Sequence, residues 1–187
     1  MRLRRFAALA LFIAGLCAAA ASPAGAAAPG GRFILWDKSH QAVTDQDFRG
    51  RFMLVFFGYT FCPDICPTSL NTIAEAMELL GKDAQQVVPI FISVDPARDT
   101  VEHLRDYVDA FDSRIVGLTG TPEMIARVAA AYKVTYTKVK EAGTEDDNYT
   151  IDHTASVFLM GPDGKFLVKF LHGITPEDLA KRIRDFL

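Results

Sequence analysis

Apolar residues in this chain occur in two patterns, as unbroken runs and as runs with helical spacing. The unbroken runs at residues 52–58 and 87–94 are typical of strands that are buried on both faces of a sheet. Elsewhere, apolar residues recur every three to four positions, which indicates amphipathic helices. With threonine and proline at helix starts and glycine at a helix end, the pattern predicts helices at residues 67–81, 100–111, 121–132 and 175–187.

The other apolar segments are short and predict further strands. These strands cover residues 33–36, 42–43, 115–118, 134–139, 156–160 and 166–170. The last two flank a Gly-Pro-Asp-Gly turn, which is typical of a β-hairpin. Strands that alternate with helices and end in a hairpin predict a mixed sheet with helices on both faces. We therefore expect an α/β, thioredoxin-like fold, a mixed central β-sheet flanked by helices with an added N-terminal hairpin.

The first 26 residues differ from the rest of the chain. Three arginines among the first five residues precede an uncharged run of 16 residues, and an Ala-x-Ala sequence ends at Ala26. This arrangement is typical of an export signal, and the run is shorter than the ~20 residues that cross a bilayer comfortably. We expect cleavage after Ala26, with an uncleaved N-terminal anchor as the alternative. Lipidation of Cys17 is disfavoured, because the preceding Leu16 is too large.

Residues 1–26 are thus an export signal or anchor, residues 27–32 a flexible leader, and residues 33–187 one domain. An exported protein of this kind is periplasmic, either soluble or tethered to the inner membrane by its N-terminal segment. Loss of residues 1–26 removes three arginines, so 17 basic residues face 23 acidic ones and the net charge moves from −3 to −6. Such an acidic domain is a poor nucleic-acid binder. We expect a monomer that binds no nucleic acid.

Cys62 and Cys66 form a C-x-x-x-C pair directly after the apolar run at residues 52–58. Pro67 marks the first turn of a helix, so we expect Cys66 near the helix start, where unpaired N–H groups favour a thiolate. A purely structural disulfide is disfavoured, because a short loop yields the smallest chain-entropy gain. The pair can cycle between dithiol and disulfide, or it can bind a soft metal such as Cu(I) or zinc.

A metal site needs more ligands than these two sulfurs, and the candidates are His40, His103, His153 and His172. His153 is the preferred one, because it precedes an apolar strand and follows a long polar segment. The alternative is an ordinary hydrogen-bonded loop histidine, and the sequence alone does not show that His153 meets the cysteines. Two thiolates and one imidazole would suit Cu(I), and a weak fourth ligand could also hold Cu(II).

Three blocks of this sequence, residues 58–68, 92–100 and 152–155, closely resemble the Sco (SenC) copper proteins. The resemblance implies an exported thioredoxin-like domain that binds one copper ion, Cu(I) or Cu(II), through Cys62, Cys66 and His153. It also implies delivery of copper to the binuclear copper centre of cytochrome c oxidase, or reduction of that centre's cysteines. The implied partners are the copper-bearing oxidase subunit and a copper donor protein. Phe61 departs from the family, which often has a polar residue there.

Two other functions compete with copper delivery. A thiol–disulfide oxidoreductase would use Cys62 and Cys66 to reduce a partner's cysteines and would not need His153. A peroxidase of the peroxiredoxin type would need a P-x-x-x-T-x-x-C pattern, which neither cysteine has.

Further expectations concern side chains near these motifs. Residues 95–100 are expected to form a strand-to-helix connection with an Asp/Arg pair. Asp152 is expected either to orient the neighbouring histidine or to face solvent. Trp36 is expected in the core.

Overall fold

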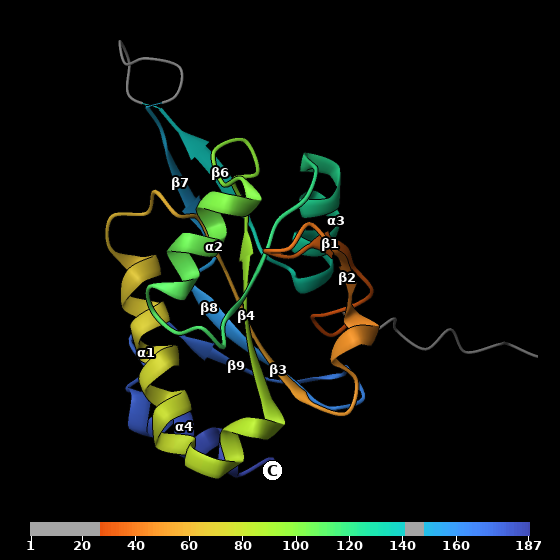
Figure 1. Ribbon diagram of the computed structural model, residues 1–187, viewed down its shortest axis with the longest axis vertical. Coiled ribbons are helices and arrows are strands. Elements are labelled where there is room, and N and C mark those ends of the chain that lie inside the picture. Colours follow the sequence, from red (N-terminus) through yellow and green to blue (C-terminus); the bar gives the residue numbers. More distant parts are fainter. Residues whose placement is uncertain (1–26, 141–147) are drawn as a thin grey trace, which may run out of the picture.

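A computed structural model describes residues 27–140 and 148–187 of the chain (Figure 1). The predicted export signal or anchor, residues 1–26, lies outside the described residues, as do residues 141–147 of the polar segment before His153. Among the described residues, no helix is long and apolar enough to cross a membrane.

The centre of the protein is a five-stranded mixed sheet in the order β5-β4-β3-β8-β9. Its strands are β3 (Phe52–Gly58), β4 (Val87–Ser93), β5 (Val116–Leu118), β8 (Ser156–Met160) and β9 (Phe166–Leu171). β3, β4 and β5 run parallel, whereas β8 and β9 are antiparallel to their neighbours. Every residue of β3 and β4 is buried, as their unbroken apolar sequences predict.

Helices cover the sheet on both sides (Figure 1). They are α1 (Ile65–Leu80), α2 (Val101–Asp109), α3 (Pro122–Tyr132) and α4 (Pro176–Arg184). Short 3-10 helices lie before β3, at Asp45–Phe48, and between α1 and β4, at Gly81–Gln86. The last three helices begin at threonines whose hydroxyls accept a backbone N–H of the first turn, a favourable N-cap. The predicted mixed sheet flanked by helices is confirmed, although α1 begins at Ile65 rather than at Pro67.

Two small antiparallel sheets lie beside the main one. The predicted N-terminal hairpin is present as β1 (Ile34–Trp36) and β2 (Ala42–Thr44), but the prediction for Trp36 is wrong. Only Leu35 of β1 points inward, and Trp36 is 39% exposed because successive strand residues face opposite ways.

The second small sheet pairs β6 (Tyr136–Val139) with β7 (Thr150–His153). β6 is mostly exposed, as its sequence predicts, whereas β7 was not predicted as a strand. β7 is only four residues long and contains a single buried apolar side chain, so it carries almost no periodic signal. This hairpin, at the top of Figure 1, ends at His153, which belongs to the site described below.

Candidate metal centre

The structure brings Cys62, Cys66 and His153 together at the carboxyl end of β3. Cys62 lies in the loop after β3, Cys66 in the first turn of α1, and His153 at the end of β7. Their ligand atoms all lie within 4.8 Å of one another, and both cysteines are free thiols. Cys66 Sγ is 3.3 Å from His153 Nε2, although the two residues are 87 positions apart in sequence. Beside them is a cavity of about 370 Å³, which the three β7 residues before His153 help to line.

The start of α1 explains how the sulfur of Cys62 is held. Asp64 is the N-cap residue, but its side chain makes no capping hydrogen bond. Instead, the backbone N–H of Cys66 donates to Cys62 Sγ at 3.4 Å. Pro67, the next residue, has no N–H to satisfy. Cys62 Sγ therefore accepts a hydrogen bond from a helix start, where negative charge is stabilised.

The pKa values of the two thiols are shifted in opposite directions. A hydrogen bond from Cys66 lowers the pKa of Cys62 to about 4, with further help from the backbone N–H groups of Asp64 and Cys66. The bond to Cys62, together with burial, raises the pKa of Cys66. The prediction that Cys66 is the thiolate-prone cysteine is therefore wrong. The N–H groups at the start of α1 point back toward Cys62, while Cys66 is fully buried.

Gly58, the last residue of β3, leaves room for the sulfur of Cys66. A Cβ at this position would lie 2.6 Å from Cys66 Sγ and 2.8 Å from Phe91. No side chain larger than hydrogen fits there without displacing one of them. The sequence pattern marks Gly58 only as the end of a strand, because a close approach of this kind has no local signal.

The imidazole of His153 is oriented by its surroundings. Its ring meets Phe56 and Tyr59 edge-on, with ring centroids 6.2 Å and 6.0 Å away. Nδ1 lies 3.3 Å from the carbonyl oxygen of Thr154, to which it can only donate. The proton on Nδ1 leaves the lone pair of Nε2 directed at Cys66, which is the tautomer that a metal ligand needs. Asp152 is exposed on the opposite face of β7 and so faces solvent.

The other histidines have different contacts. His40 bonds to Glu102, His172 bonds to Ser69, and His103 stacks on the ring of Phe61. Among residues 27–140 and 148–187, the only group of three or more cysteine, histidine or carboxylate side chains placed to hold a metal is the one containing His153.

The donor set favours a particular class of metal. Two sulfurs and one imidazole nitrogen are soft or borderline ligands, which suit Cu(I). Structural zinc sites are almost always closed by four protein ligands, and the described residues supply three here. The residues thus fit a copper ion better than a structural zinc ion.

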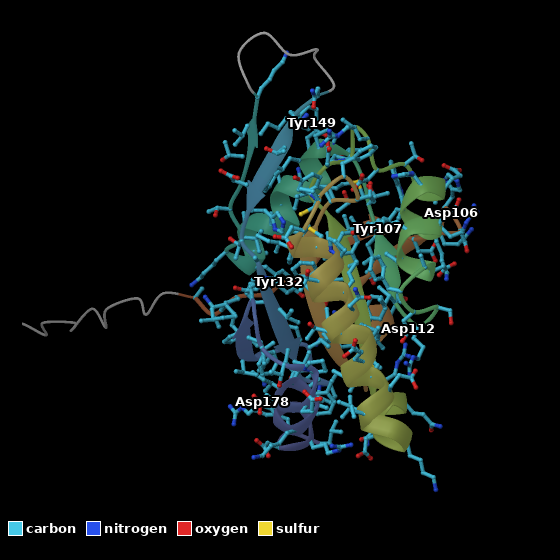
Figure 2. All side chains as sticks on the ribbon, turned by 90° about the vertical axis from the view of Figure 1, so that its left-hand side faces the viewer. Asp106, Tyr107, Asp112, Tyr132, Tyr149 and Asp178 are labelled. Atoms are coloured by element: carbon cyan, nitrogen blue, oxygen red, sulfur yellow. The ribbon has the colours of Figure 1, made fainter. Side chains whose placement is uncertain are left out.

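The surroundings of the site include residues that the sequence analysis did not single out. Tyr149, on the edge of the β6–β7 hairpin (Figure 2), binds Asp95 through its hydroxyl. Arg98 pairs with Asp95 at 2.6 Å, which confirms the expected ion pair. The block at residues 92–100 was the only sequence signal for this network.

Comparison with known proteins agrees with this geometry. The family model described as SCO1/SenC matches residues 21–187. The structure of Bradyrhizobium japonicum ScoI with copper bound is 47% identical, with a TM-score of 0.78, and covers 86% of this chain and 100% of that one. The structure of Arabidopsis thaliana ScoI with copper bound is 38% identical, with a TM-score of 0.79, and covers 84% of this chain and 97% of that one.

Among curated proteins, "Protein sco1" of Schizosaccharomyces pombe is 40% identical over 158 residues, which are 84% of this chain and 60% of that protein. The chain thus spans less than two thirds of that relative's length. The likeness to solved Sco structures confirms the predicted thioredoxin-like fold. The chain therefore belongs to the SCO1/SenC family.

Proposed function

We propose that this protein binds one copper ion through Cys62, Cys66 and His153. We propose further that it delivers the copper to the binuclear copper centre of cytochrome c oxidase, or prepares that centre. The observation that carries the proposal is the convergence of two sulfurs and an imidazole within 4.8 Å at the mouth of a cavity. Family membership supports the role at the oxidase. The name of one solved structure, BsSco, refers to the Sco family of cytochrome c oxidase assembly proteins.

The donor atoms are suited to an ion that must be both held and released. Cys62 is half-buried, whereas Cys66 is fully buried. A partner can therefore reach a bound metal ion from the side of Cys62. Cys66 and His153 would hold the ion on the other side. Exchange through an accessible thiolate is consistent with a carrier.

Anaerobic titration of the reduced domain with Cu(I), in competition with a chromophoric chelator, tests the binding. We expect one tightly bound ion per chain and a sharp loss of affinity in Cys62→Ser, Cys66→Ser and His153→Ala. The Cu(II) form should show a thiolate-to-copper absorption band that changes in His153→Ala. His103→Ala, which alters a histidine outside the cluster, is the matched control. Wild-type affinity in His153→Ala would refute the three-ligand site.

A second function, thiol–disulfide exchange with a partner's cysteines, is favoured by the acidity of Cys62. A thiol with a pKa of about 4 is a thiolate at neutral pH, and the thiolate is the attacking species. In that reaction the Cys62 thiolate would attack a partner disulfide, form a mixed disulfide and release one partner thiol. Cys66 would then attack the Cys62 sulfur and release the second partner thiol, leaving a Cys62–Cys66 disulfide. The copper centre would be prepared by this reduction rather than by metal transfer. Reduction of a model disulfide that is unaffected by His153→Ala would support it.

We propose that the domain acts in the periplasm, either free or tethered by residues 1–26. The support is the basic start, apolar run and Ala-x-Ala end of this segment. Mass determination of the mature N-terminus, together with cell fractionation, tests this. A chain beginning at residue 27 in the periplasmic fraction is the expected result, and an intact chain in the cytoplasm would contradict it.

A further inference from the structure

We propose that the turn after β4, residues 95–99, positions the two halves of the metal centre relative to each other. This inference deepens the proposed copper site and rests on it. One side of the turn holds the loop that carries Cys62, and the other holds the hairpin that carries His153. We call its three charged residues, Asp95, Arg98 and Asp99, the bridge.

Asp99 makes the connection to the cysteine loop. Its carboxylate accepts the backbone N–H of Thr60 at 3.1 Å and the Thr60 hydroxyl at 2.7 Å. It also accepts the hydroxyl of Ser93 at 2.5 Å and is fully buried. Thr60 is two residues before Cys62, so these bonds fix the start of the loop that presents the first sulfur. Hydrogen bonds to a buried carboxylate are among the stronger ones in a protein.

Asp95 and Arg98 make the connection to the histidine hairpin. The hydroxyl of Tyr149 donates to Asp95 at 2.8 Å, and Arg98 donates to the backbone oxygen of Tyr149 at 3.0 Å. The guanidinium of Arg98 also lies over the Tyr149 ring, 3.6 Å from its centroid. Asp95 is fully buried. Tyr149 is therefore held through its hydroxyl, its ring and its backbone.

The geometry of β7 transmits this anchoring to His153. Alternate residues of a strand share one face, so Ile151 and His153 point to the same side, and Tyr149, directly before β7, continues the alternating exposure. Their exposure agrees, because the residues between them are exposed and Ile151 is buried. The backbone N–H of Ile151 also donates to the hydroxyl of Tyr59 at 3.1 Å. His153 is thus the end of a short segment that is fixed at two preceding positions on its own face.

The bridge itself is rigid, so it can transmit position from one side to the other. The backbone N–H groups of Arg98 and Asp99 both donate to the carbonyl of Asp95, which closes the turn. The side-chain carboxylates of Asp95 and Asp99 are therefore held at a fixed separation. Because one binds the hairpin and the other the loop, the bridge sets the distance between the imidazole and the first sulfur.

The test is a double-mutant cycle on Cu(I) affinity, measured anaerobically by chelator competition on the reduced domain. Tyr149→Phe removes the hydroxyl bond to Asp95 and keeps the ring. We expect it to weaken Cu(I) binding by about 10-fold, the lower end of the loss when an outer partner of a ligand is removed. In the His153→Ala background the same change should have no further effect. The Cu(II) absorption spectrum of Tyr149→Phe should shift toward that of His153→Ala.

Two comparison variants separate the sides of the bridge. Thr60→Val removes the hydroxyl bond to Asp99, keeps the backbone bond and changes the shape little. Its effect should persist in the His153→Ala background because it acts on the cysteine loop. Tyr136→Phe removes a hydroxyl of the same hairpin outside this network and should bind Cu(I) as wild type does. Thermal unfolding of each variant verifies that it is folded.

Several outcomes decide the proposal. Unchanged affinity in Tyr149→Phe, or an equal loss with and without His153, would overturn it. If wild-type protein binds no Cu(I), the proposed function fails. The positioning role of the bridge is then tested on the metal-free protein by the rate of amide hydrogen exchange. There Tyr149→Phe should speed exchange at Ile151 and His153, relative to Tyr136→Phe. Unchanged exchange at both amides would then overturn the bridge.

Discussion

Gly58→Ala is expected to damage the metal centre although it replaces none of the three proposed ligands. The added methyl group would lie 2.6 Å from Cys66 Sγ and 2.8 Å from Cε2 of Phe91. Favourable contact between such atoms begins near 3.5 Å, so the sulfur must retreat by about 0.9 Å. Ligand positions in metal sites are defined to about 0.2 Å, so a shift of this size breaks the geometry.

Two quantities should change in this variant. Overpacking a tight core site typically lowers the free energy of unfolding by about 1–3 kcal/mol, which urea denaturation measures. Cu(I) affinity should fall by at least about 10-fold, which corresponds to about 1.4 kcal/mol. Chelator competition on the reduced protein measures this loss.

Gly117→Ala is the matched control. Gly117 is also in a central-sheet strand, and its added methyl group would meet Leu104 at 3.1 Å and Val108 at 3.3 Å, away from the cysteines. It should lower stability and leave Cu(I) affinity unchanged. The reasoning is refuted if Gly58→Ala binds Cu(I) as tightly as wild type, or if both variants lose affinity equally.

Three further predictions follow from the acidity of the thiols and from the core. The pKa of Cys62 is lowered to about 4 in the folded protein from an ordinary thiol value of 9.0, so its contribution to stability is complete above pH 9 and is lost as pH falls toward 4. Urea unfolding between pH 5 and 8 should show a shallower pH dependence in Cys62→Ser, and identical slopes would contradict this. Cys66→Ala removes the thiol that donates to Cys62, so iodoacetamide should alkylate Cys62 more slowly at pH 6; an unchanged rate would count against that hydrogen bond. Phe158→Ala removes a fully packed ring between Phe57 and Tyr132 and should cost about 3–5 kcal/mol of unfolding free energy, whereas a loss below about 1 kcal/mol would show that this cluster is not tightly packed.

Local pattern predicted most of the elements of the fold. The buried strands β3 and β4 are apolar without a break, and the helices α2, α3 and α4 begin at capping threonines. Such signals are strong because burial and capping act over a few neighbouring residues. β7 was not predicted because it lacks such local signals. Its four residues are held by pairing with β6 and by the Tyr59 hydroxyl.

The sequence by itself determined the chemistry available to this protein, namely two thiols on a constrained turn and an imidazole before a strand. Only the tertiary structure decided how these groups meet. Packing of the β6–β7 hairpin places His153 Nε2 3.3 Å from Cys66 Sγ, across 87 positions of chain. The direction of the N–H groups at the start of α1 makes Cys62, and not Cys66, the acidic thiol. Both outcomes depend on contacts between distant segments, which no local pattern of residues encodes.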